Sequence, residues 1–211
     1  MIVTVAHTKG GVGKSTLAFS LATARGGNVW LIDGDRQATC KMAMTIRNQT
    51  DRLPFIQCDN LPDGKELHAQ LSARKNQFSD VVIDAGGRDS SALRAALLLS
   101  DLVIVPFAPR SLDVWALGDM SVIIKEARKL NPGLRAAAVL SCADPSGKDN
   151  KDAVDALGDY PEFTYMDAPI VRRKSFANAM SLGLSVDELT PKDTKATKEL
   201  KRLIDNAFIS L

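Results

Sequence analysis

Eight residues near the start of the chain have the types and the spacing that bind phosphate. The segment KGGVGKST, residues 9–16, follows a short apolar run at residues 2–6 and precedes a helix-like stretch at residues 17–24. When a glycine-rich loop connects a strand to the beginning of a helix, its backbone N–H groups and the positive end of the helix dipole point at one site. Lys14 would then reach the β- and γ-phosphates of a nucleotide, and the Ser15 hydroxyl would bind Mg²⁺. The alternative interpretation is an ordinary glycine turn, but such a turn does not require all of these residues at this spacing.

The loop supplies a set of candidate nucleotide-binding residues. Glycine has no β-carbon, so the backbone at these positions can turn tightly and approach a phosphate. The predicted nucleotide-binding residues within the loop are Gly10, Gly11, Val12, Gly13, Lys14, Ser15 and Thr16. Nucleotide binding by one subunit does not require Lys9, which is either a solvated loop lysine or has a separate role.

Three aspartates follow apolar, strand-like runs. Asp33 and Asp35 lie at the end of the run that begins at residue 29, and Asp84 ends the run at residues 80–84. Parallel strands buried on both faces read as continuous apolar runs, and ligands gather at their carboxyl ends. We therefore expect the three carboxylates to converge on the phosphate loop, where one can hold Mg²⁺ and another can orient an attacking water. Each aspartate could instead cap the helix that follows its strand.

Composition and periodicity predict one α/β domain spanning residues 1–211. The hydrophobic content is 45% and the formal net charge is +2. Apolar runs and amphipathic stretches alternate, which predicts a three-layer sandwich with a mostly parallel central sheet of about seven strands, of the P-loop NTPase type. The expected strands are residues 2–7, 29–33, 55–57, 80–84, 102–107, 134–141 and 163–166. The expected helical stretches include 61–76, 90–100, 112–130 and 151–157, with two more after residue 172, and turns are expected at 132–133 and 144–147.

Several features place this domain in a reducing cytoplasm. The three cysteines, Cys40, Cys58 and Cys142, are odd in number and have no CxxC spacing, which argues against a disulfide framework or a zinc knuckle. An early first strand leaves no room for a signal peptide. The longest apolar stretch, residues 95–108, is interrupted by Asp101 and Pro106 and is too short to span a bilayer. His7 and His68 are isolated, and we interpret both as structural or surface residues.

The loop and the middle of the chain resemble a known family. KGGVGKST resembles the deviant Walker A signature of the ParA/MinD group of ATPases, and residues 80–113 resemble the small ParA-type plasmid partition ATPases, including the ParF branch. Two departures stand out. Arg36 occupies a position that is usually proline, and Ala85-Gly86-Gly87 replaces the more frequent Thr-Pro-Pro.

The resemblance implies roles for individual residues. Lys9 would cross a dimer interface and contact phosphates held by the partner, so the implied catalytic residues are Lys9, Lys14 and Asp35, with Asp35 positioning the water. The implied metal-binding residues are Ser15, Asp33 and Asp84, with Asp84 at the Walker B position. The implied cofactors are ATP/ADP and Mg²⁺, and the segments after Ser141 and near Pro191 would form walls for the adenine base.

The resemblance also implies a DNA-segregation ATPase, associated with the nucleoid, that forms a homodimer on binding ATP and works with a centromere-binding, ParB-like adaptor protein. No N-terminal helix-turn-helix domain is expected, so DNA would be bound through its phosphates without base readout. Arg172, Arg173 and Lys174 stand where the family contacts nonspecific DNA. Residues 172–202 hold eight Lys or Arg against four acids, although such a surface can also be a solvated helix face.

Two other functions remain open from the sequence. An apolar stripe in the last segment could bind a membrane surface, as in MinD, although such a stripe is more often a terminal helix packed on the sheet. The stripe consists of Leu200, Leu203, Ile204, Ala207, Phe208 and Leu211. We expect core packing and no stable membrane association. A metabolic synthetase related in fold is the third possibility, but the sequence shows no feature of a pocket for a second organic substrate.

Overall fold

A parallel β-sheet forms the centre of the molecule. The computed structural model describes residues 1–50, 52–145 and 148–208. The strands are β1 (Ile2–Val5), β2 (Val29–Asp33), β3 (Gln57–Asn60), β4 (Asp80–Asp84), β5 (Leu102–Phe107), β6 (Arg135–Ala143), β7 (Thr164–Tyr165) and β8 (Ile170–Val171). They follow the order β3-β2-β4-β1-β5-β6-β7, β8 also pairs with β6, and every pairing in the described part of the chain is parallel. The predicted fold class is confirmed.

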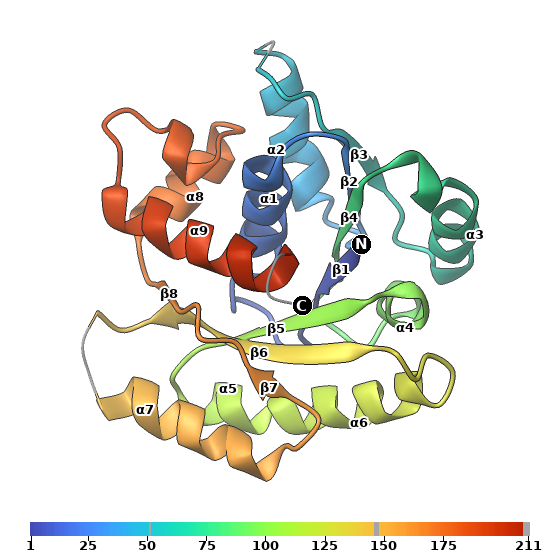
Figure 1. Ribbon diagram of the computed structural model, residues 1–211, viewed down its shortest axis with the longest axis vertical. Helices are drawn as coiled ribbons and strands as arrows, with labels where there is room; N and C mark the ends of the chain where they lie inside the picture. The colour runs from blue at the N-terminus through green and yellow to red at the C-terminus, as the bar shows by residue number, and fades with distance from the viewer. Residues whose placement is uncertain (51, 146–147, 209–211) are drawn as a thin grey trace.

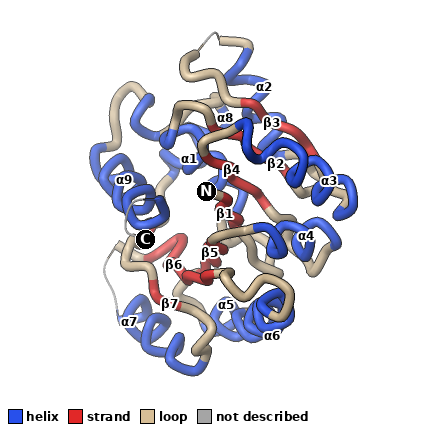
Figure 2. Tube along the Cα trace, turned by 45° about the vertical axis from the view of Figure 1, so that its right-hand side comes forward, coloured by secondary structure: helices blue, strands red, loops and turns tan. Residues whose placement is uncertain are grey.

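Helices cover both faces of this sheet (Figure 1). They are α1 (Lys14–Arg25), α2 (Thr39–Asn48), α3 (Gly64–Arg74), α4 (Ser91–Leu99), α5 (Ser111–Trp115), α6 (Leu117–Arg128), α7 (Lys148–Asp155), α8 (Lys174–Ser181) and α9 (Thr194–Phe208). Short 3-10 turns are η1 (Lys75–Gln77), η2 (Ala156–Asp159) and η3 (Val186–Glu188). Helices α1, α2, α8 and α9 pack on one face and α3 to α7 on the other, and the rotated view in Figure 2 shows the same two layers around the strands.

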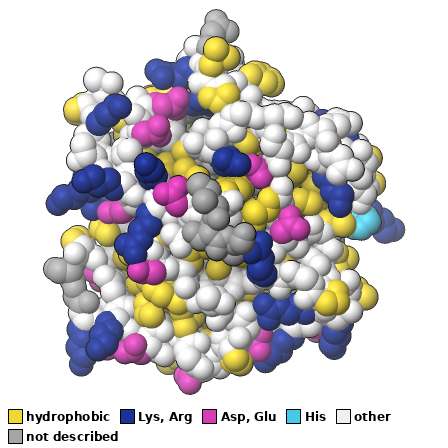
Figure 3. Space-filling model, in the orientation of Figure 1, with side chains coloured by type: hydrophobic (Ala, Val, Ile, Leu, Met, Phe, Trp, Pro, Cys, Tyr) yellow, Lys and Arg dark blue, Asp and Glu magenta, His cyan; other side chains and the backbone are white. Residues whose placement is uncertain are grey.

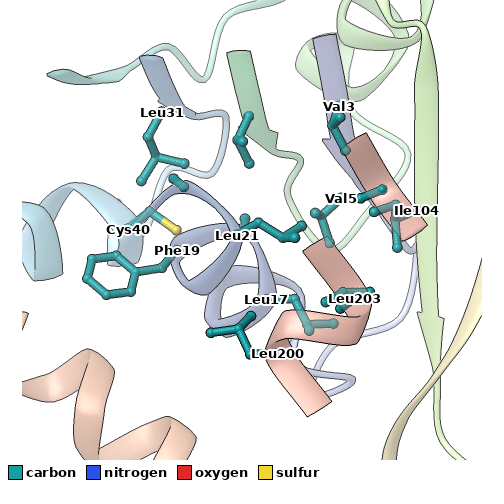
Figure 4. Packing of buried hydrophobic residues seen from close by; sticks show 14 of the residues in the cluster. Val3, Val5, Leu17, Phe19, Leu21, Leu31, Cys40, Ile104, Leu200 and Leu203 are labelled. Atoms are coloured by element: carbon teal, nitrogen blue, oxygen red, sulfur yellow. The ribbon is translucent and has the colours of Figure 1, made fainter. Parts of the chain in front are cut away.

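The C-terminal apolar stripe packs into the core. Leu200, Leu203 and Ala207 are buried, and Ile204 and Phe208 pack partly buried against the same cluster. Figure 4 shows Leu200 and Leu203 facing Leu17 of α1, close to the central strands. The remaining member of the stripe, residue 211, lies outside the described residues. Core packing therefore explains the described part of the stripe, and no helix among the described residues is long and apolar enough to cross a membrane.

The structure differs from the sequence prediction in four places. Helix α2 was not predicted. Strand β3 starts at Gln57, where the predicted strand ended. The predicted helical stretch at residues 112–130 is two helices, α5 and α6, which meet at Ala116. The two-residue strand β8 was not expected, and the turn predicted at residues 144–147 lies partly outside the described residues.

Candidate nucleotide-binding site

The phosphate loop has the backbone that its glycines predict. Gly11 and Gly13 have φ angles of 80° and 87°, which side-chain-bearing residues rarely adopt. Helix α1 begins directly afterwards, at Lys14. A β-carbon added at Gly10 or Gly11 would meet no atom within 4 Å. The loop is therefore open on the side where a phosphate would lie.

A cavity of about 750 Å³ opens from this loop. Its lining comes from four segments: the loop, the turn after β2, Pro62, and the segment between β4 and α4. The lining residues include Gly10, Gly11, Gly13, Lys14, Ser15, Thr16, Asp35, Gly86 and Gly87. The carboxyl ends of β1, β2 and β4, which are adjacent in the sheet, thus meet at this cavity, as parallel α/β sheets predict.

Lys14 is held at the cavity with its charge only partly balanced. Its side-chain amine donates a hydrogen bond to the Lys9 carbonyl oxygen at 2.8 Å, and the residue is only 7% exposed. Burial lowers the pKa of Lys14, while the charges of Asp84 and Asp35 oppose that shift. An anion in the loop would provide the partner that this ammonium group lacks.

Asp84 presents an unsatisfied carboxylate oxygen beside Lys14 and Ser15, two of the residues that line the cavity. The residue is 1% exposed. Its Oδ2 accepts a hydrogen bond from the Cys40 thiol at 3.3 Å, and the nearby Ser15 hydroxyl lowers the pKa of this carboxyl group. Oδ1 has no hydrogen-bond partner in the described part of the chain. Burial raises the pKa of Asp84 to about 7, and the negative charge of Asp33 adds to the effect.

These groups fit a magnesium ion that is completed by other ligands. A buried carboxylate oxygen without a partner, next to a serine hydroxyl, is a suitable pair of hard oxygen donors. No group of three or more His, Cys, Asp or Glu in the described residues is arranged to hold a metal. Mg²⁺ ordinarily takes one or two carboxylates and completes its shell with substrate phosphates and water. The site therefore suits an ion that arrives with a nucleotide.

Asp33 is occupied by backbone contacts. It is fully buried, with Oδ1 accepting a hydrogen bond from the Asp35 N–H and Oδ2 from the Lys41 N–H, both at 3.0 Å. The residue at the N-cap of α2, Ala38, has no side-chain bond to offer, so Asp33 performs the capping. The capping alternative considered from the sequence describes these contacts, and a role beside the metal stays a prediction.

Asp35 lies at the cavity wall and is partly exposed. Its Oδ1 accepts a hydrogen bond from the Gln37 N–H at 3.0 Å. A β-carbon on Gly86 would come within 3.4 Å of its Oδ2, so the segment after β4 lies against this carboxylate. The placement suits a group that orients a water molecule, which stays a prediction.

Lys9 is not a solvated loop lysine. Its amine forms an ion pair with Asp113 at 3.0 Å, and the Asp113 side chain is only 7% exposed. Its backbone N–H donates a hydrogen bond to Nδ1 of buried His7 at 2.9 Å. No pattern in the sequence indicated this pairing, although Asp113 follows the carboxyl end of a central strand, as the other acids of the site do. Cys40 was missed as well, and no pattern in the sequence marks it.

The remaining predicted residues lie elsewhere. Pro191 is exposed and does not line the cavity, so no contact supports its predicted role beside the base. Arg173 is bound by Glu199 of α9, with its Nη2 at 2.8 Å from Oε1. Arg172 and Lys174 are exposed. Figure 3 shows Lys and Arg side chains over the region of α8 and α9, interspersed with Asp and Glu.

The geometry of the loop, the cavity and the acids agrees with a family match. Residues 3–208 match the family described as the CobQ/CobB/MinD/ParA nucleotide binding domain. The chain belongs to this family. The predicted resemblance to the ParA/MinD group is thereby confirmed.

Individual proteins are also similar to this chain over most of its length. The maintenance of carboxysome distribution protein A of Halothiobacillus neapolitanus is 28% identical over 214 residues, covering 98% of this chain and 95% of that protein. A structure from Borrelia burgdorferi described as a plasmid partition protein, with AMPPNP bound, has a TM-score of 0.75 at 21% identity and covers 100% of this chain and 99% of its own. Cobyrinic acid a,c-diamide synthase from Mycobacterium smegmatis, with an ATP analogue and magnesium, has a TM-score of 0.69 at 20% identity, covering 85% and 92%.

The two structural likenesses establish the fold of this chain. Both structures hold an ATP analogue, and the synthase also holds magnesium. These ligands agree with the ATP/ADP and Mg²⁺ expected from the sequence. The fold alone does not separate a positioning ATPase from a synthetase, so the choice depends on the site and its surface.

Proposed function

We propose that this chain is a weak Mg²⁺-dependent ATPase that positions a cellular cargo by cycling on and off DNA. The observation that carries the ATPase is that Lys14, Ser15 and Asp35 line one cavity beside the glycine loop, with the Asp84 carboxylate buried next to Lys14 and Ser15. The resemblance to partition proteins and the relative named for carboxysome distribution support the positioning role. Both kinds of relative are named for the placement of a large particle.

Each group at the cavity has a defined task in this proposal. Residues 10–16 hold the phosphates through their N–H groups, and Lys14 neutralises phosphate charge. Ser15 and Asp84 hold Mg²⁺, which when bound neutralises charge on the phosphates. Asp35 orients a water whose oxygen bonds to the γ-phosphorus while the bond to the bridging oxygen breaks. The electron pair of that bond leaves with ADP, and the water's protons pass to the phosphate product and solvent.

Lys9 would connect hydrolysis to dimer formation. In the single chain its amine is neutralised by Asp113 at the mouth of the loop. A second copy carrying ATP would offer a phosphate as an alternative partner. ATP would thus favour a homodimer in which each Lys9 contacts the nucleotide of the other subunit, and hydrolysis would remove this contact.

The DNA surface would involve the exposed cations near the start of α8. Arg172 and Lys174 can contact phosphates of any sequence, and a dimer presents two copies of them. A ParB-like adaptor bound to the cargo would stimulate hydrolysis and release. A nucleoid location in the cytoplasm follows from this cycle. Because the apolar stripe of α9 is packed in the core, no surface feature of that helix favours a membrane cycle.

A sedimentation experiment tests this function. The protein is mixed with duplex DNA or with anionic liposomes, each with ATP, with ADP and without nucleotide, beside Lys14→Ala as the control. We expect the parent to sediment with DNA only in ATP and the variant to remain in the supernatant. Sedimentation with liposomes instead of DNA, or ATP-independent behaviour identical to Lys14→Ala, would contradict the proposal.

A further inference from the structure

Two arginines with no side-chain partner line the part of the cavity that lies beyond the phosphate loop. Arg36 and Arg88 are both exposed, and both line the same cavity as Lys14. Within residues 1–50, 52–145 and 148–208, neither guanidinium has a hydrogen bond or an ion pair. Exposed arginines are common. Two unpaired arginines that line the same cavity, however, can bind the same ligand.

The nearby acids do not neutralise these two arginines. Asp89, directly after Arg88, is bound by Arg94 through two contacts of 2.7 Å. Arg94 in turn also binds Glu126 at 2.7 Å, so this cluster is satisfied without Arg88. The positive charge of Arg88 therefore remains available at the cavity wall.

The backbone places both arginines next to the position of the terminal phosphate. A β-carbon on Gly87 would lie 3.2 Å from the Lys14 amine, so the chain passes directly over the group that neutralises phosphate charge. Arg88 is the next residue. Arg36 directly follows Asp35, whose carboxylate lies against the same segment after β4. Each arginine is thus one residue away from a group that borders Lys14 or Asp35.

We propose that Arg36 and Arg88 bind the terminal phosphate of the nucleotide within the same subunit and so distinguish ATP from ADP. A guanidinium group presents parallel N–H donors that match phosphate oxygens. Glycine at 86 and 87 leaves the backbone before Arg88 without side chains that would obstruct its approach. This inference rests on the proposed ATPase function and adds to it Arg36, which the sequence marked only as a departure from the family pattern, and Arg88, which the sequence analysis did not single out.

The test compares affinities for two nucleotides. Binding of ATPγS and of ADP, both with Mg²⁺, is measured by calorimetry for the parent and for the double variant Arg36→Gln/Arg88→Gln. Removing charge-assisted contacts to a single phosphate should weaken ATPγS binding roughly 10- to 100-fold and leave ADP binding within about twofold. Arg36→Lys/Arg88→Lys should recover part of the loss, because it restores charge without the planar donor pair.

The controls separate this inference from the ATPase proposal. Arg135→Gln removes an arginine at the amino end of β6, whereas the cavity lies at the carboxyl ends of the strands, and should change neither affinity. Lys14→Ala should lose both nucleotides. Equal losses for ATPγS and ADP in the double variant, or no loss of either, would overturn the terminal-phosphate role while the ATPase proposal stands. A parent that binds neither nucleotide better than Lys14→Ala would overturn both.

Discussion

At the scale of single residues, the two lysines of the loop face different partners. Lys14 is turned inward to the Lys9 carbonyl oxygen and is influenced by Asp84 and Asp35, whereas Lys9 reaches Asp113 at the loop mouth. We predict that Lys14→Ala abolishes ATP binding. Lys9→Ala should leave binding to the monomer measurable by calorimetry but prevent ATP-dependent dimers in analytical ultracentrifugation. Equal loss of nucleotide binding in both variants would remove the separate role of Lys9.

The ion pair itself leads to a second prediction. If Lys9 must leave Asp113 to contact a partner's phosphate, Asp113→Asn should lower the protein concentration at which ATP-bound dimers form. A partly exposed pair contributes about 1 kcal/mol, and the dimer opens two such pairs, so its dissociation constant should fall roughly 30-fold. Sedimentation velocity over a concentration series in ATP would measure the change. Weaker dimers in Asp113→Asn would instead show that the pair supports the dimer.

The buried side chain of His7 predicts that the folded protein loses stability in acid. Burial lowers the pKa of His7 from 6.5 to about 4, and the charge of Lys14 adds to the effect. Between these values the unfolded chain binds a proton that the folded chain does not, so the free energy of unfolding falls as pH decreases from 6.5 to 4. In His7→Asn an amide oxygen can replace Nδ1 as acceptor for the Lys9 N–H. The variant should lose less stability on acidification, by on the order of 3 kcal/mol over this window.

Urea unfolding of parent and variant across that pH range measures the difference. The raised pKa of Asp84, about 7, acts with the opposite sign, because stability from a raised carboxyl pKa is lost as pH rises. That contribution is present in both proteins and cancels in the comparison. Parallel pH profiles would mean that His7 is not the source of the effect.

Much of the site was predictable from the sequence at this scale, and the reason is local. The spacing of Lys14 and Ser15 within one loop fixes their placement, and Asp84 is placed by the end of an apolar strand. The pairing of Lys9 with Asp113 was not predictable, because it depends on how the segment after β5 folds back toward the loop. The contact of the Cys40 thiol with Asp84 depends likewise on α2, which was itself missed.

At the scale of elements, α2 shows why one helix was missed. Its buried positions are Cys40, Ala43, Met44 and Arg47, spaced as a helix requires, but the last of them is charged. Arg47 is tolerated in the interior because its guanidinium binds Glu188 at 2.7 and 3.0 Å and the Gly183 carbonyl oxygen. These partners are remote in sequence, so periodicity alone could not identify the stripe.

Strand β3 was misplaced for a related reason. The predicted segment contained apolar Phe55 and Ile56, whereas the strand consists of the mainly polar residues Gln57–Asn60. Among the described residues it pairs only with β2, and its register with that strand, from Trp30 opposite Gln57 onward, sets its limits. An edge strand can carry polar residues because one side lacks a neighbouring strand. The central strands have neighbouring strands on both sides, so they must be apolar, and their predicted bounds lie close to the observed ones.

The contacts between α8 and α9 refine the DNA prediction. Because Arg173 is held by Glu199, its replacement should mainly loosen the attachment of α9, whereas Arg172 and Lys174 are free to contact phosphates. We expect Arg172→Ala/Lys174→Ala to weaken binding to two unrelated duplexes equally. The slope of log affinity against log salt should decrease by roughly 0.9 for each lost contact per monomer. Fluorescence anisotropy over a salt series in ATP measures both quantities.

Arg173→Ala is the matched comparison for that prediction. It should lower the melting temperature by roughly 2–4 °C for each kcal/mol of lost ion-pair stabilisation and leave the salt slope unchanged. If Arg173→Ala flattens the slope and the double variant does not, the DNA surface includes Arg173 and the pair with Glu199 must open on binding.

At the scale of the whole molecule, the position of Asp35 leads to a prediction about how long the ATP-bound dimer persists. Asp35 lines the cavity but is not part of the glycine loop, so its removal should slow hydrolysis while leaving phosphate binding intact. Asp35→Ala should therefore accumulate as an ATP-bound dimer that remains on DNA. Size-exclusion chromatography with light scattering in ATP measures the dimer, and a phosphate-release assay measures turnover. An unchanged turnover rate would assign the water-orienting role to another acid.

The position of β1 has a consequence for how the protein is made. The first strand of the chain lies in the middle of the sheet, where it pairs with β4 and β5. A ribosome adding about 5–20 residues per second needs roughly 5–20 s after making β1 to complete β5. Until then one side of β1 has no neighbouring strand, because only β4 has been made. Ribosome-stalled chains ending shortly after residue 78 should remain protease-sensitive around the loop, whereas protection should begin only in chains long enough for residue 107 to have left the exit tunnel.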